Sequence, residues 1–158
     1  MKTIEGQKNI RGQKFGIVVS RFNHFITKRL LSGCLKEFKK RGIKDNDLTV
    51  VWVPGSFEIS VTALKLAEKK SLSAVVCLGA VIRGETLHFD LIARAAADGI
   101  RDVSLKTGKP VVFGVITADT VDQAYRRSDD KGDHKGREAA RCAMDMASVF
   151  NQLSLKKM

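Results

Sequence analysis

The chain has 158 residues, a length that suits one domain and leaves little room for a second. Its hydrophobic content of 44% is enough for a core and argues against a disordered chain, and no apolar run approaches the roughly 20 residues of a membrane span. The formal net charge of +11 suits either nucleic-acid binding or a solvated basic surface with a site for anionic ligands, and we favour the second because the basic residues are scattered among acidic ones.

The N-terminal segment and the cysteines favour a cytoplasmic protein. Residues 1–14 lack the apolar stretch of a secretory signal. The three cysteines, Cys34, Cys77 and Cys142, lie far apart, and their sequence forms no C-x-x-C pair. We therefore expect all three to be reduced and structural, in a cytoplasmic compartment.

Four short runs of apolar and β-branched residues predict strands. None of them alternates polar and apolar residues, so we expect both faces of each strand to be buried, as in a parallel sheet. The runs are 15–19 (FGIVV), 48–53 (LTVVWV), 74–82 (AVVCLGAVI) and 110–116 (PVVFGVI).

Each strand is followed by a segment with helical spacing of apolar residues. The first helix carries an apolar face from Ile26 to Phe38. For the second helix we expect Ser56 as the N-cap, and for the third we expect Thr86 as the N-cap and Gly99 as the end.

The chain ends with two further predicted helices. Thr120 and Gln123 have the spacing of a capping box, and a last helix spans 136–153, with Ala139, Ala143 and either Met146 or Ala147 facing inward. This alternation of strands and helices predicts a single domain over residues 1–158, built as a three-layer α/β/α sandwich around a four-stranded parallel sheet.

The segments that follow the four strands are the expected place for a ligand. In open α/β sheets, ligands bind beyond the carboxyl ends of the strands. These segments are 20–25 (SRFNHF), 54–58 (PGSFE), 83–88 (RGETLH) and 117–120 (TADT), and we expect them to meet at one edge of the sheet.

Three side chains in these segments can serve a ligand, and each also has a purely structural interpretation. Phe22 can stack on a planar ligand or fold back onto the core. Glu58 can accept hydrogen bonds from a ligand or simply complement a helix dipole. His88 can transfer protons, because a helix N-terminus disfavours the imidazolium, or it can be a capping or surface histidine.

A polar loop, SDDKGDHKG (128–136), has a residue that could bind an anion near each of its ends. Arg127 precedes this loop and Lys135 lies near its end, so together they can hold a phosphate or a carboxylate, although each can equally be a solvated charge. The three histidines lack the spacing of metal ligands, so we expect no metal.

Several of these segments carry a specific resemblance. The motifs SRFNHF, PGSFE, LGAVIRGETLHFD, FGVITADT and HKGREAA occur in the order and spacing typical of the lumazine synthase family, and the resemblance covers about Phe15 to Phe150. It implies a flavodoxin-like fold and a transferase reaction of riboflavin biosynthesis without metal or organic cofactor. In that reaction 5-amino-6-ribitylaminouracil condenses with 3,4-dihydroxy-2-butanone 4-phosphate, releasing phosphate and water and giving 6,7-dimethyl-8-ribityllumazine.

The resemblance also implies roles on the pyrimidine side of the site. Phe22 would stack on the pyrimidine ring, and Glu58 would accept hydrogen bonds from ribityl hydroxyls. The remaining residues implied to line the pyrimidine and ribityl pocket are Ser56, Phe57, Val81 and Ile82.

On the phosphate side, the resemblance gives a meaning to residues 79–86 (GAVIRGET). This stretch has the glycine spacing of a P-loop, but Glu85 replaces the lysine that contacts a triphosphate. The backbone N–H groups of Glu85 and Thr86 would instead hold a single phosphate at a glycine-enabled turn and a helix start. Arg127 would pair with that phosphate, Lys135 would lie beside the substrate, and His88 would transfer protons.

The family assembles as homopentamers, some of which form shells of twelve pentamers. Phe113 would then reach into the site of a neighbouring subunit, and residues 1–13 could add a strand to a neighbour's sheet. Two departures from the family pattern are Ser60, where a proline is usual, and Asp133–His134, where Gly-Asn is common. We expect little effect from the first, whereas the second leaves the size of the assembly open.

Two alternatives stay open at this point. One is an archaeal-type riboflavin synthase, which resembles this fold and dismutates two lumazines. The other is a basic binding or cage protein with nucleic acid as its partner, although that function gives no reason for Phe22, Glu58, His88 and Arg127 to follow strand ends.

Overall fold

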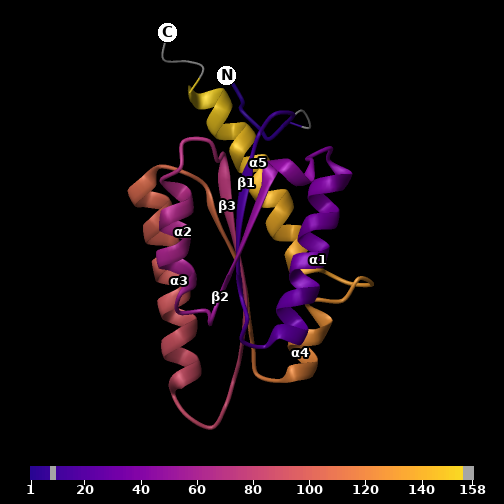
Figure 1. The fold of residues 1–158 in the computed structure, drawn as a ribbon, viewed down its shortest axis with the longest axis vertical. Helices are drawn as coiled ribbons and strands as arrows, with labels where there is room; N and C mark the ends of the chain where they lie inside the picture. The colour runs from indigo at the N-terminus through magenta and orange to yellow at the C-terminus, as the bar shows by residue number, and fades with distance from the viewer. Residues whose placement is uncertain (8–9, 155–158) are drawn as a thin grey trace.

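The structure, a computed structural model, describes residues 1–7 and 10–154. Its four strands are β1 (Phe15–Ser20), β2 (Leu48–Val53), β3 (Ala74–Ile82) and β4 (Val111–Ala118). They pair in parallel in the order β2-β1-β3-β4. Helices cover both faces of this sheet, so the predicted three-layer, flavodoxin-like sandwich is confirmed (Figure 1).

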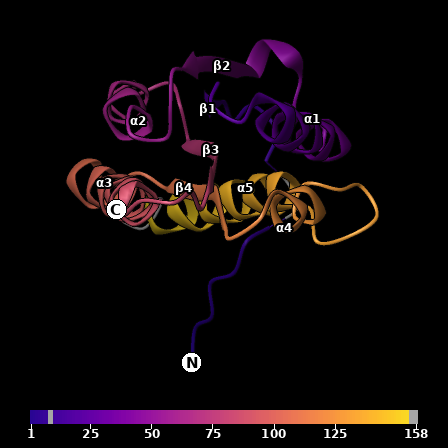
Figure 2. The same cartoon turned by 90° about the horizontal axis from the view of Figure 1, so that it is seen from below.

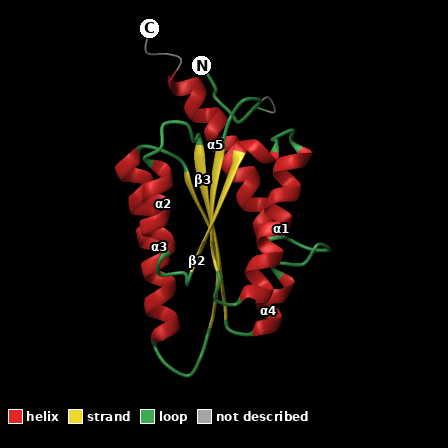
Figure 3. Cartoon of the chain, in the orientation of Figure 1, coloured by secondary structure: helices red, strands yellow, loops and turns green. Residues whose placement is uncertain are grey.

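The helices form two layers, seen edge-on in Figure 2. One layer holds α1 (His24–Lys40), α4 (Val121–Arg126) and α5 (Lys135–Ser154), and the other holds α2 (Ile59–Ala67) and α3 (His88–Thr107). A short 3-10 turn, Asp45–Asp47, precedes β2. Figure 3 shows the strands of the sheet lying between the two layers of helices.

The hydrophobic core lies on both faces of the sheet, as the inner strand β1 shows. Every residue of β1 is buried, and successive residues face opposite layers: Ile17 packs toward α1 and α5, whereas Val18 packs toward α2 and α3. The outer strands differ from the prediction that all four strands are buried on both faces. Thr49 and Val50 of β2 are exposed, because β2 forms an edge of the sheet in the isolated chain.

Three predicted helix boundaries are wrong. The N-cap position of α3 is Leu87 and not the predicted Thr86, which lies one residue earlier. Ser56 does not cap α2: the N-cap position is Glu58, no side chain caps it, and Ser56 is buried. Gly99 does not end α3, which continues to Thr107 and stops at Gly108 in the left-handed conformation. Gly99 lies instead where α2 and α3 approach, since a Cβ there would lie 2.8 Å from the Cβ of Ser60.

The predicted capping box and last helix are confirmed. The N–H of Gln123 donates to Thr120 Oγ1 over 3.2 Å, while Gln123 Oε1 accepts from the N–H of Asp119 over 2.8 Å. In α5 the inward position is Ala147, which is buried, rather than Met146, which is exposed.

The cysteines and the N-terminal segment complete the description. Cys34, Cys77 and Cys142 are free; burial raises the pKa of the first two thiols, whereas Cys142 is exposed on α5 and lies outside the core. Residues Glu5 and Gln7 contact α5 of the same chain: the N–H of Gln7 donates to Ser148 Oγ over 2.9 Å, and the carbonyl of Glu5 accepts from Gln152 Nε2 over 2.7 Å. Residues 8–9 of the predicted pairing segment 1–13, and 155–158 of the predicted domain, lie outside the described residues. No helix in the described ranges is long and apolar enough to cross a membrane.

Candidate active site

A cavity of about 620 Å³ opens at the carboxyl ends of β1, β2 and β3. The chain runs from β1 outward to β2 on one side of the sheet and from β3 outward to β4 on the other side. The cavity therefore lies at the topological switch point, where such folds bind ligands. Its lining consists of Phe22, Pro54, Gly55, Ser56, Phe57, Glu58, Ala80, Val81, Ile82, Gly84, Thr86, His88, Phe89 and Ile92.

The first wall of the cavity is Phe22, which a tight turn after β1 holds in place. Its side chain is 70% exposed, so it does not fold back onto the core. The N–H of Phe22 donates to the carbonyl of Pro54 over 3.0 Å. Asn23, in the left-handed conformation at φ 55°, donates from Nδ2 to the carbonyl of Ala80 over 2.9 Å. Sequence reasoning gave Asn23 no role, although asparagine is one of the few residues that tolerate this conformation.

The second wall is the segment that enters α2. Phe57 is exposed toward the cavity, and Glu58 Oε2 lies 3.1 Å from where a Cβ of Gly55 would be. A Cβ at Gly79 would lie 2.8 Å from Ser56 Oγ. Gly79 is therefore a strand glycine that admits Ser56 against β3, and not part of a phosphate-binding turn.

The third wall is the loop after β3 and the start of α3. His88 is the first helical residue, and its N–H donates to Thr86 Oγ1 over 3.4 Å, so Thr86 serves the helix start from one residue before the N-cap position, Leu87. The N–H groups of Glu85 and Thr86 make no hydrogen bond within the described residues, which leaves them available to an anion.

One prediction about this loop needs correction, and two lining residues of the cavity were missed. Gly84 has no positive φ, and a Cβ there would meet no atom within 4 Å, so the chain conformation does not require glycine at this turn. Phe89 and Ile92 also line the cavity and were not predicted. Their helical spacing from His88 is the signal that would have found them.

The end of β4 does not join this cavity, contrary to the prediction that four strand ends line one site. Arg127 lies in a separate hollow with Thr117 and Gln123. Phe113 is 45% exposed and borders a third hollow with Lys135, whose Nζ pairs with Glu138 Oε2 at 2.6 Å. The reason is the strand order, because β4 is the outer strand beyond β3.

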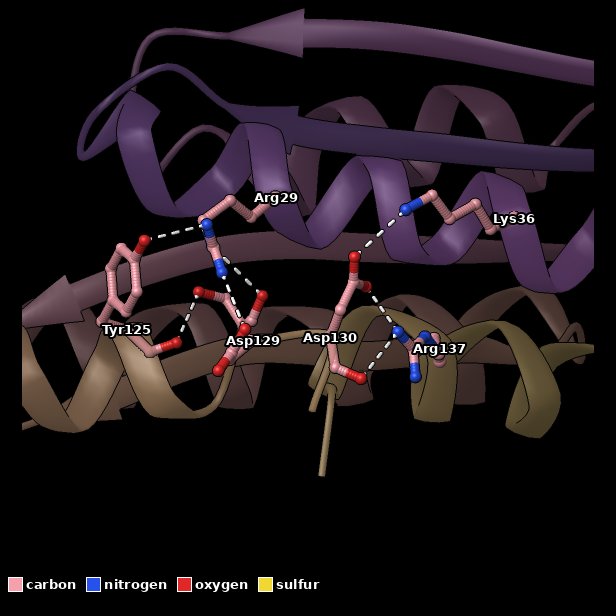
Figure 4. Close-up of polar contacts among 7 residues, drawn as sticks. Arg29, Lys36, Tyr125, Asp129, Asp130 and Arg137 are labelled. Atoms are coloured by element: carbon pink, nitrogen blue, oxygen red, sulfur yellow. Dashed lines mark hydrogen bonds and ion pairs between the residues drawn. The ribbon is translucent and has the colours of Figure 1, made fainter. Parts of the chain in front are cut away.

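The polar loop between Arg127 and Lys135 is fastened to the helical layer (Figure 4). Arg29 of α1 pairs with Asp129 at 3.2 Å and donates to Tyr125 Oη over 3.0 Å. Asp130 bridges Lys36 of α1, at 3.2 Å, and Arg137 of α5. The loop is therefore tied to α1 and α5, and its two ends meet where the N–H of Lys135 donates to the carbonyl of Arg127 over 2.9 Å.

His134, one of the two residues that depart from the family pattern, is buried under this loop. A Cβ at Gly33 would lie 2.2 Å from its ring, so the imidazole packs directly on α1. Its Nδ1 accepts from the N–H of Gly136 over 3.1 Å. Burial, aided by the charge of Arg137, lowers the pKa of His134, which keeps the ring neutral.

Metal ligands do not gather in the described residues, where no group of three or more His, Cys, Asp or Glu side chains is placed to hold an ion. The lining of the cavity is apolar, with one carboxylate, one imidazole, small hydroxyls and free backbone N–H groups. Such a lining suits a planar, partly polar organic ligand with an anionic group.

Comparison with known proteins points the same way. Residues 12–151 match the family model described as 6,7-dimethyl-8-ribityllumazine synthase. A protein of that name from Protochlamydia amoebophila (strain UWE25) is 50% identical over 155 residues, which are 98% of this chain and 90% of the relative.

Proposed function

Since the chain belongs to the 6,7-dimethyl-8-ribityllumazine synthase family, we propose that it condenses 5-amino-6-ribitylaminouracil with 3,4-dihydroxy-2-butanone 4-phosphate. The reaction is a transferase step of riboflavin biosynthesis that releases phosphate and water. It needs neither a metal nor an organic cofactor.

The observation that supports the proposal best is that one cavity brings together Phe22, Glu58, Thr86 and His88. Glu85 does not line the cavity itself, but it lies between two residues that do, Gly84 and Thr86. These residues come from three segments that together span more than sixty positions of the sequence, and they face the same space. Holding two substrates together in one cavity by itself lowers the barrier by several kcal/mol, about 7–11 in the best-oriented cases.

Each residue has a task that the reaction requires. Phe22 stacks on the pyrimidine, and Glu58 accepts hydrogen bonds from the ribityl hydroxyls. Ser56, Phe57, Val81 and Ile82 complete this pocket.

The phosphate side supports proton transfer and the departure of the leaving group. The N–H groups of Glu85 and Thr86 face the phosphate, and their dipoles stabilise its charge as it leaves. His88 lies in the same wall and moves the protons that imine formation and ring closure require.

Arg127, Phe113 and Lys135 lie outside the cavity of their own chain, and we propose that they complete the cavity of a neighbouring subunit. The assembly is a homopentamer or a shell of twelve pentamers, built from single-domain subunits of residues 1–158. The exposed edge of β2 would accept residues 1–13 of a neighbour once that segment leaves the contact that Gln7 makes with α5 of its own chain. The enzyme acts in the cytoplasm.

The direct test mixes both substrates with purified protein and follows lumazine absorbance and fluorescence. We expect product formation that requires both substrates. Supplying lumazine alone separates this function from that of a riboflavin synthase, because riboflavin would then appear. Protein that shifts RNA but forms no lumazine would reject the enzyme in favour of a nucleic-acid-binding protein.

A further inference from the structure

Arg83 connects three segments around the loop that carries Glu85, Thr86 and His88. Its Nε donates to Asp119 Oδ1 over 2.8 Å, and its Nη1 donates to Asp90 Oδ2 over 3.1 Å. Its guanidinium carbon lies 4.1 Å from the centre of the Phe89 ring. Its own N–H donates to the carbonyl of Ala118 over 2.9 Å.

These contacts close the loop between β3 and α3 into a ring. Arg83 stands at one end of the loop, and Asp90, in the first turn of α3, stands at the other. Between them, the main contact within the loop is the 3.4 Å hydrogen bond from His88 N–H to Thr86. The position of the loop therefore depends on the side chain that joins its ends.

The same side chain fixes the start of α3 relative to the cavity. Phe89 lines the cavity, and the guanidinium of Arg83 lies over its ring. Arg83 also forms an ion pair with Asp90, the next residue of α3. Since His88 precedes both residues in the helix, a shift of this first turn moves the imidazole as well.

Arg83 is unsuited to bind the substrate phosphate directly. Its Nε and Nη1 already engage two carboxylates, so the cluster of Arg83, Asp90 and Asp119 has two negative charges against one positive charge and disfavours an anion. The hydrogen bond that Arg83 donates to Asp119, followed by the one it donates to Asp90, raises the pKa of Arg83, which keeps it charged throughout.

We propose that Arg83 is a positioning residue for the reaction, which holds the Glu85–Thr86 N–H groups and His88 toward the phosphate substrate. The inference rests on the proposed roles of this loop. The side chain of Arg83 is 43% exposed, and exposed ion pairs contribute little to global stability. Its loss should therefore change kinetics and leave the melting temperature nearly unchanged.

The test compares Arg83→Ala and Arg83→Lys with Arg101→Ala in the assembled enzyme. Arg101, which lies on α3, is a matched control. Like Arg83, it has an exposed side chain that pairs with two aspartates, here Asp98 and Asp102. For Arg83→Ala we expect kcat/KM for the butanone phosphate to fall about tenfold, because small misplacements of reacting groups cost large factors in rate. The KM for the pyrimidine and the activity of Arg101→Ala should stay within about twofold of wild type. Arg83→Lys should restore only part of the activity, since an ammonium cannot bridge both carboxylates and stack on Phe89.

The variant His88→Ala tests the proposed function independently of Arg83, so comparing the two variants shows which of the two proposals fails. If Arg83 acts partly through His88, the double variant loses less than the product of the two single losses. Wild-type kinetics of Arg83→Ala, or an equal change of KM for both substrates, would overturn the positioning role even if His88→Ala is impaired. If Arg83→Ala does not fold, Asp119→Asn and Asp90→Asn carry the test, with the same selective effect on the phosphate substrate expected.

Discussion

Asn23 Nδ2 donates to the carbonyl of Ala80 over 2.9 Å and so joins the turn after β1 to the end of β3. Asn23 combines two properties at this point, because it adopts φ 55° and supplies the donor. The contact orients the neighbouring Phe22 over the cavity. The two strands that flank the switch point are therefore tied directly beside the proposed pyrimidine site.

Replacing Asn23 separates the two properties. Asn23→Gly keeps the left-handed conformation and loses the donor, whereas Asn23→Ala loses both, so we expect the alanine variant to lose about 1–2 kcal/mol more in the free energy of unfolding. Both should raise the KM for the pyrimidine. Denaturant unfolding and steady-state kinetics measure these effects, and equal stability of the two variants would show that φ carries no cost here.

His88→Ala tests proton transfer. We expect kcat to fall about 100-fold while substrate binding largely survives, because positioning by the other walls remains. Turnover measured from acid to alkaline pH gives the check: a wild-type pH profile and rate in the variant would eliminate the proposed role.

Arg127→Ala tests the proposed phosphate partner. Removing a charge-assisted hydrogen bond to phosphate should raise the KM for the butanone phosphate about 10- to 100-fold. The pyrimidine substrate is the internal control, and its KM should change little. An equal loss for both substrates would mean that Arg127 supports the assembly and not the phosphate.

Mixing the two impaired variants, and measuring at a butanone phosphate concentration below the KM, tests whether the site is shared between subunits. If each site takes His88 from one chain and Arg127 from its neighbour, rings assembled from equal amounts of both variants contain wild-type sites. Random assembly should then recover about a quarter of wild-type activity. Activity no greater than that of the separate variants would place both residues in one chain's site.

The sequence predicted the strands well and the helix ends less well. Runs such as 74–82 have one dominant signal, continuous β-branched and apolar residues, and the strand matches it residue for residue. Gly99 was mistaken for a helix end because its role is a close approach to Ser60, a tertiary contact that one-dimensional spacing does not contain.

The candidate site shows the same division. Phe22, Glu58 and His88 were found because strand ends in a parallel sheet share an edge. The separation of Arg127 from them was not predicted, since it depends on β4 being the outer strand. Arg83 and Asn23 were missed as positioning residues because their partners lie far along the chain or on the main chain.

His134 should make stability depend on pH. Its pKa is lowered in the folded state, chiefly by burial and then by Arg137, with Asp130 opposing. The unfolded chain therefore binds more protons, and the stability that neutral His134 provides is complete above the unfolded pKa of about 6.5 and is lost as pH falls below it. Protonation at Nδ1 would also remove the acceptor for the N–H of Gly136.

We expect the free energy of unfolding to decrease from pH 7 to pH 5 in the wild type and to decrease less in His134→Asn. This window avoids the two carboxylates of the region whose pKa values are lowered, Glu37 beside Arg141 and Asp130 beside Lys36, because their stabilisation is lost at lower pH. Denaturant unfolding at several pH values provides the measurement. Identical slopes in both proteins over this window would mean that His134 takes up its proton without disturbing the contact with Gly33.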